Sequence, residues 1–350
     1  MGTQLSNQEH GRQVLLYFLG KARRFLSRNS AKILGVISPI WFLLCILGLN
    51  YIATDHLFAY LYGDDTYTTK VMKVIAWFMS AQMLVNWFLM SFTTSTYINT
   101  EENNAKRLEH ERLYPQFPST GVEYSQLKEK RPQFKTANWA VITDYTSGEA
   151  VRTAYPYWSW KPCVICSCDK PPRCHHCEIC KVCVLKRDHH CFFARNCIGL
   201  ENQRFFVVFN FWAVLLVLFA IPQVCCYTYL TVWPSMMYIE MFLPLTALLY
   251  LGGITPFYIL TLVFQIWSLF LFLLLAGSFL WEQYFCIDDG KTSYERENPD
   301  QEVCSTHVTR TQRFAAVFGK RLIWLNLFIP LHWMFRPTDD GVIWSSVKME

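Results

Sequence analysis

The sequence is poor in charged residues for its length. Asp, Glu, Lys and Arg make up 17% of the 350 residues, hydrophobic residues make up 52%, and the net charge is only +5. No glycine-rich phosphate loop, internal repeat or low-complexity tract stands out. The first thirty residues also lack the short apolar core and cleavage site of a secretory signal peptide. The net charge therefore says little about partners, whereas the apolar excess points to lipid.

Four apolar stretches approach or exceed the roughly 20 residues that cross a bilayer as a helix. They cover residues 33–53, 74–92, 205–229 and 254–279. Charged side chains are nearly absent from them, which argues against a channel or transporter. Residues 241–252 are apolar too, and we expect an interfacial or re-entrant segment there rather than a further span. Residues 322–335 are too short to cross and are expected either on the membrane face or as a buried amphipathic helix.

Basic residues indicate which segments face the cytosol, because cytosolic flanks collect Lys and Arg. Residues 1–32 hold six of them, residues 95–204 hold sixteen, and residues 286–350 hold eight. All three regions are therefore expected on the cytosolic side, which requires an even number of spans. We expect a cytosolic tail (1–32), a cytosolic lead-in (95–160) and a cytosolic C-terminal region (286–350).

Nine of the fourteen cysteines lie between Cys163 and Cys197, and several form pairs with two intervening residues. Such clustering is typical of metal binding in a reducing compartment, and it predicts two structural zinc ions. Free buried cysteines fit poorly because Lys, Arg and Asp are interleaved with them. A zinc module that binds nucleic acid is disfavoured because the cluster lies within a few residues of a span. Two tetrahedral sites need eight ligands, so some candidates are spare.

The predicted fold class is an all-α polytopic membrane protein with four transmembrane helices. A small two-zinc, cysteine-rich cytosolic domain, residues 161–206, is expected between the second and third helices. The bilayer is the first expected partner, and no nucleic-acid partner is expected.

The end of the cluster, Asp188-His189-His190-Cys191, resembles the DHHC-type palmitoyltransferase family. The resemblance extends to Cys197-Ile198-Gly199-x2-Asn202-x3-Phe206 and upstream to Pro171-x-Arg173. It implies a protein S-acyltransferase that moves a long-chain acyl group from palmitoyl-CoA, through Cys191, to cysteines of partner proteins. It also implies a multi-pass protein of the Golgi or endoplasmic reticulum membrane, with the plasma membrane as an alternative. The ligand sets that it implies are Cys163, Cys166, His176 and Cys183 for one zinc, and Cys177, Cys180, His190 and Cys197 for the other.

This assignment leaves Asp188, His189 and Cys191 without a metal. A thiol needs deprotonation to become a good nucleophile; His189 is a nearby base, and Asp188 could orient it. Cys191 also lies close to the third span, where an acyl tail can enter the membrane while CoA phosphates stay in water. The basic residues near enough in sequence to meet those phosphates are Lys186, Arg187, Arg195 and Arg204. A non-catalytic zinc-containing adaptor, or a partner of another acyltransferase, is the alternative.

Three motifs depart from the family pattern. Thr292-Ser293-Tyr294-Glu295 resembles its Thr-Thr-x-Glu motif, with Ser293 keeping the hydroxyl of the second Thr. Phe192-Phe193 replaces the usual Pro-Trp, so the indole hydrogen bond is lost. Arg313 stands where the C-terminal element, Phe314 to Pro330, usually begins with Asn. Rate and acyl-CoA preference are therefore expected to differ from those of typical members.

Overall fold

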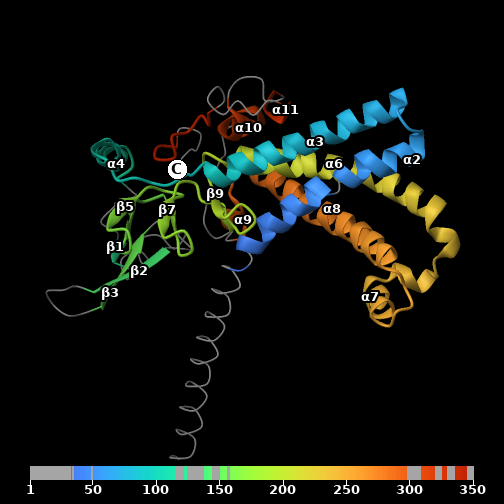
Figure 1. Ribbon diagram of the computed structural model, residues 1–350. Helices are drawn as coiled ribbons and strands as arrows, with labels where there is room; N and C mark the ends of the chain where they lie inside the picture. Colours follow the sequence, from blue (N-terminus) through green and yellow to red (C-terminus); the bar gives the residue numbers. More distant parts are fainter. Residues whose placement is uncertain are drawn as a thin grey trace, which may run out of the picture.

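The computed structural model places a bundle of long helices at one end of the molecule and a group of short hairpins at the other (Figure 1). The structure describes residues 33, 35–48, 50–115, 122–123, 138–143, 150–155, 158–297, 309–319, 325–328 and 336–344. The predicted tail 1–32 and most of the segment 322–335 lie outside the described residues. The described chain is mostly helical, which confirms the predicted fold class.

Among the described residues, four helices are long and apolar enough to cross a membrane. They are Gly35–Tyr62, which ends in α2 (Phe58–Tyr62), α3 (Tyr67–Phe92), α6 (Gln203–Thr231) and α8 (Phe257–Asp289). Each is longer than the stretch expected from apolarity because its ends carry polar residues that still form helix. The first span also contains a π-helical turn, Ala53–Leu57.

The segment between α6 and α8 contains only short helices. They are two 3-10 turns, Trp233–Ser235 and Tyr238–Met241, and α7 (Leu243–Leu251). Glu240 ties the segment together, since its carboxylate accepts bonds from Met237 N at 2.8 Å and from the Thr255 hydroxyl. Nine residues of α7 span about 14 Å, too little to cross a bilayer. Its location at the interface stays a prediction.

The cysteine-rich region consists of three antiparallel hairpins of the same size. Their strands are β4 (Lys161–Cys163) with β5 (Cys168–Lys170), β6 (His175–Cys177) with β7 (Val182–Val184), and β8 (His189–Cys191) with β9 (Asn196–Ile198). The last residue of each connecting turn has a left-handed backbone, with φ of 50° at Ser167, 62° at Lys181 and 52° at Arg195. The pairings are offset by 14 residues, so the expectation of no internal repeat was wrong.

Two asparagines fasten the third hairpin to the end of α3. Asn196 Nδ2 donates to the carbonyls of Met90 (3.1 Å) and Thr93 (2.8 Å), and Asn202 Nδ2 reaches the same two carbonyls at 3.1 and 3.0 Å. Carbonyls at a helix C-terminus lack helical partners, so these amides satisfy groups that would otherwise be unpaired. Gly199 lies between them, where an added Cβ would come within 2.7 Å of a backbone oxygen. The hairpins therefore sit at one fixed end of the bundle.

Segments before and after the hairpins pack either against the hairpins or, as α10 and α11 do, against the helix bundle. Before them come α4 (Glu101–Leu113) and a sheet of order β1-β3-β2, made of Val122–Glu123, Asn138–Thr143 and Ala150–Tyr155. After α8 come α9 (Ser293–Glu297), α10 (Arg310–Phe318) and α11 (Leu325–Phe328). The C-terminal stretch 336–344 then returns to the hairpins, where Trp344 is 2% exposed and donates to the Pro172 carbonyl at 3.3 Å.

Candidate functional site

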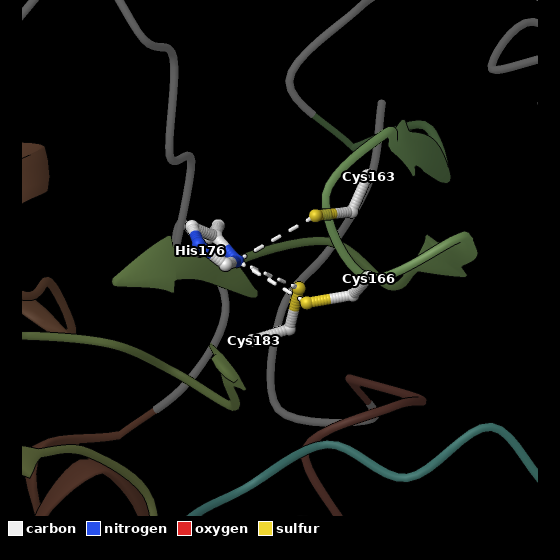
Figure 2. A group of neighbouring side chains, drawn as sticks. All are labelled: Cys163, Cys166, His176 and Cys183. Carbon is white, nitrogen blue, oxygen red and sulfur yellow. Dashed lines mark hydrogen bonds between the residues drawn. The ribbon is translucent and has the colours of Figure 1, made fainter. Parts of the chain in front are cut away.

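The first group of metal-ligating side chains joins the first and second hairpins. Cys163, Cys166, His176 and Cys183 point toward one another, with His176 facing the three sulfurs (Figure 2). His176 Nδ1 lies 3.7 Å from Cys163 Sγ, 3.3 Å from Cys166 Sγ and 3.9 Å from Cys183 Sγ. Cys163 and Cys166 come from β4 and the turn after it, His176 from β6 and Cys183 from β7, so the hairpin fold assembles the group.

The second group repeats this arrangement 14 residues later. His190 Nδ1 lies 3.7 Å from Cys177 Sγ, 3.3 Å from Cys180 Sγ and 3.6 Å from Cys197 Sγ. In a zinc tetrahedron with Zn–S of about 2.3 Å and Zn–N of about 2.0 Å, neighbouring S and N ligands lie about 3.5 Å apart. Both groups therefore fit a four-coordinate metal with three sulfur ligands and one nitrogen ligand. Zinc bound there would be structural, since all four positions are filled by protein.

Three spare candidates lie beside the first group. Cys168 faces Cys163 across the β4–β5 pair, and Cys174 is buried next to Cys183. His175 is directed away from the metal group and packs against Tyr294, with ring centroids 4.6 Å apart. None of these three belongs to either metal group within the part of the chain that the structure describes.

Asp188, His189 and Cys191 form a connected series that excludes His190. His189 Nδ1 lies 2.9 Å from Asp188 Oδ2, and His189 also hydrogen-bonds Cys191. Burial lowers the pKa of His189, but the hydrogen bonds and negative charges of Asp188 and Cys191 outweigh it and raise the pKa to about 10. Burial raises the pKa of Asp188, yet its bonds from His189, Ser293 and Gln283 hold that pKa below its usual value. An ionised Asp188 can thus stabilise an imidazolium that has taken the Cys191 proton.

Helix α9 brings Ser293 to the other side of Asp188. The Ser293 backbone N–H donates to Asp188 Oδ1, and its hydroxyl donates to Oδ2 at 3.0 Å. Glu295 fixes α9 in turn, because Arg173 Nε and Nη2 each bond one of its carboxylate oxygens at 2.7 Å. Trp344 lies under the Arg173 guanidinium, 4.6 Å from its centre. The C-terminal stretch therefore belongs to the scaffold of the site.

An aromatic cluster separates Cys191 from a cavity between the spans. Phe193 packs edge-on against Phe42 at 5.0 Å and lies 5.3 Å from Phe209, while Trp87 Nε1 donates to the Phe193 carbonyl at 3.3 Å. Phe42 also lines the cavity, which continues between the first span, α3, α6 and α8 as far as Tyr227. The walls are mainly apolar, so the cavity suits a hydrocarbon chain.

The four basic residues that the sequence places near Cys191 differ in exposure. Arg195 is exposed, Arg187 is half-buried, and Lys186 and Arg204 are buried at 6% and 3% exposure. Burial, together with the charge of Arg173, lowers the pKa of Lys186 to about 8.

Lys186 lines a small pocket with further cations from the C-terminal half of the chain. The pocket residues that carry charge are Arg173, Lys186, Lys291, Arg313 and Asp339. Lys291 and Arg313 were not among the predicted site residues, because only the fold brings them to Lys186.

Two further residues at the site were missed by the sequence analysis. Gln283 Nε2 donates to Asp188 Oδ2 at 2.7 Å, and Gln203 Nε2 donates to Gln283 Oε1 at 2.9 Å. Both are 2% exposed. Gln283 is a polar residue near the end of an apolar span, and such residues are functional candidates by position alone. That was the available signal.

Comparison with known proteins places one family on this region. Residues 158–300 match the family model of the DHHC palmitoyltransferase domain. A comparison with curated proteins gave no match. The family match covers all three hairpins, α6, α7, α8 and α9, and it confirms the resemblance noted from the sequence.

Proposed function

We propose that the chain is a protein S-acyltransferase, on the premise that residues 158–300, which match the DHHC palmitoyltransferase family model, act as such a domain. The observation that carries the proposal is the separation of roles within four residues. His190 joins a metal group, while Asp188, His189 and Cys191 lie outside both groups and contact one another. An adaptor needs the metal ligands but has no use for this second set.

The proposed reaction has two steps. The Cys191 thiol gives its proton to His189, and its sulfur attacks the carbonyl carbon of a long-chain acyl-CoA. The bond to the CoA sulfur breaks, and CoA leaves with the proton from His189. A cysteine thiolate of a partner protein then attacks the new thioester, and Cys191 is released. One thioester replaces another in each step, so orientation and a dry acyl pocket are needed rather than an energy source.

The cavity supports a long acyl chain as the group that is transferred. Its wall on the first span runs from Phe42 to Phe58, which corresponds to about 24 Å of helix. One leaflet of bilayer hydrocarbon is only about 15 Å deep, so the cavity is long enough for an acyl chain that reaches through a whole leaflet. Phe42 touches Phe193, two residues from the nucleophile, so a chain attached to Cys191 would enter the cavity past this aromatic contact.

The basic residues around Cys191 support CoA as the acyl carrier. We assign the CoA phosphates to Lys186, Arg187, Arg195 and Arg204, with exposed Arg195 meeting them first. The hairpins, which carry the metal groups and the proposed catalytic residues, lie at one end of the bundle (Figure 1). With the basic flanks expected in the cytosol, we propose a cytosolic active site in an endomembrane of the Golgi or endoplasmic reticulum.

The test is thioester labelling of the purified protein with an alkyne-tagged palmitoyl-CoA. Wild type is expected to take up one hydroxylamine-sensitive label, found on the peptide that contains Cys191. Cys191→Ser should lose the label, while Cys225→Ser, which removes an exposed thiol on α6, should keep it. Equal labelling of Cys191→Ser and wild type would refute Cys191 as the acyl carrier. An intact protein with about two zinc ions per chain and no labelling at all would favour the adaptor.

A further inference from the structure

Two buried amides connect the membrane helices to the catalytic carboxylate. Gln203 lies at the first turn of α6, and Gln283 lies near the end of α8. The bonds run from Gln203 Nε2 to Gln283 Oε1 (2.9 Å) and from Gln283 Nε2 to Asp188 Oδ2 (2.7 Å). Water cannot replace them, since both side chains are 2% exposed.

The direction of this chain of bonds is fixed by chemistry. An ionised carboxylate only accepts hydrogen bonds, so Gln283 must turn its NH2 group toward Asp188. Its oxygen then faces Gln203, which must present its own NH2 group. If Gln203 were lost, the Gln283 amide would have a buried oxygen without this donor and less reason to hold its orientation.

Gln283 acts on the atom that orients the catalytic base. Asp188 Oδ2 receives His189 Nδ1 at 2.9 Å, Gln283 Nε2 at 2.7 Å and the Ser293 hydroxyl at 3.0 Å. Three donors from three different elements define the position of this one oxygen. The position of Oδ2 sets the direction of the His189 ring, and so the direction of its bond to Cys191.

We propose that Gln283 is a positioning residue for the Asp188–His189 pair and that Gln203 holds Gln283 in register. This inference rests on the proposed acyl transfer to Cys191. Neither glutamine is among the residues expected to touch acyl-CoA. Their loss therefore slows acylation of Cys191 and leaves the acyl-CoA concentration for half-maximal rate nearly unchanged.

The variants separate the effect of losing the hydrogen-bond donor of Gln283 from the effect of changing the packing around it. Gln283→Leu removes the donor at similar volume, and Gln283→Glu places a second carboxylate against Asp188. Gln203→Leu and the double variant Gln203→Leu/Gln283→Leu test the serial order. Asn86→Leu is the matched control, because Asn86 is a buried amide on α3 that bonds only a backbone carbonyl of its own helix among the described contacts.

Single-turnover acylation with labelled palmitoyl-CoA is measured by rapid quench over a range of acyl-CoA concentrations. Loss of one hydrogen bond to a charged group corresponds to a rate decrease of about tenfold or more for Gln283→Leu. Gln283→Glu should be slower still, Gln203→Leu intermediate, and the double variant no slower than Gln283→Leu. The acylation rate of Asn86→Leu should stay within about twofold of the wild-type rate, because no described hydrogen bond connects Asn86 to Asp188.

Three results would overturn this relay of hydrogen bonds from Gln203 through Gln283 to Asp188. The first is a wild-type acylation rate for Gln283→Leu. The others are a rise in the half-saturating acyl-CoA concentration as large as the fall in rate, and additive effects of the two substitutions in the double variant. Absence of wild-type labelling would instead refute the proposed function. The relay then remains testable through alkylation of Cys191 by iodoacetamide, followed by mass spectrometry. Gln283→Leu must change that rate relative to wild type and Asn86→Leu, and an unchanged rate counts against the relay.

Discussion

Replacement of Glu295 by Ala should release α9 from the hairpins. The Arg173–Glu295 pair is almost fully buried, with side-chain exposures of 3% and 0% and two bonds of 2.7 Å. Removing one partner of a buried pair costs about 3–5 kcal/mol because the other charge stays buried without compensation. Each 1.4 kcal/mol changes an equilibrium constant about tenfold, so the equilibrium between bound and released α9 shifts toward release by a factor of about one hundred to several thousand.

Hydrogen exchange followed by mass spectrometry measures this shift directly. In Glu295→Ala, the protected amides of residues 286–297 should exchange faster by a large part of this shift in the equilibrium. Acyl labelling of Cys191 should also become slower, because Ser293 no longer bonds Asp188. Glu295→Gln, which keeps one bond and loses the charge, should be intermediate. Arg173→Met/Glu295→Leu should regain part of the protection, since no buried charge remains. Exchange of Glu295→Ala within threefold of wild type would show that the pair does not hold α9.

Three further outcomes are expected. Ala194→Cys completes a Cys-x2-Cys pair with Cys191, so added zinc should block labelling at concentrations that leave wild type active; equal sensitivity of both proteins would contradict the shared geometry of the three hairpins. Trp344→Ala removes a 2% exposed side chain and its contact with Arg173, and should destabilise the hairpin region by about 3–5 kcal/mol in denaturant titration, whereas Trp281→Ala, on an exposed face, should have a smaller effect. Burial lowers the pKa of His110 to about 4, so the unfolded state takes up a proton before the folded state does as the pH falls. The protection of α4 amides against hydrogen exchange should therefore decrease between about pH 6.5 and 4, after correction for intrinsic exchange rates. His110→Leu should remove that pH dependence.

The parts of the fold that local sequence determines were predictable. Apolar length predicted four membrane helices, and the described residues contain four helices long and apolar enough to cross a membrane. Cysteine and histidine spacing predicted two metal groups, because a pair with two intervening residues closes a tight turn whatever surrounds it. The ends of the helices were not predictable from apolarity. Thr66 begins α3 by accepting a bond from Thr69 N at 3.1 Å, and Gly290 ends α8 with a φ of 69°.

Contacts between distant segments account for what was missed. Gln203 and Gln283 are 80 residues apart, and no sequence motif around either residue predicts that they contact each other. Trp344 lies 172 residues from Pro172. A tryptophan near the end of a chain has no periodicity or spacing that indicates burial. Only the packing of α6 on α8, and the return of residues 336–344 to the hairpins, brings these side chains to Asp188 and Arg173.

The 14-residue repeat explains how one fold can hold both metal groups and the proposed nucleophile. Cys163, Cys177 and Cys191 occupy the same position at the end of the first strand of each hairpin. After Cys163 and Cys177, the second cysteine of the turn and the His and Cys of the next repeat complete a metal group.

After Cys191 those three positions hold Ala194, Arg204 and Phe211. The third thiol is therefore presented with the stiffness of a zinc ligand but without the other ligands. Asp188 and His189 lie beside it instead of a metal. Cys191 is partly buried against the aromatic core and belongs to neither metal group, which is what the proposed acyl transfer needs, and this follows because the third repeat lacks the other three ligands.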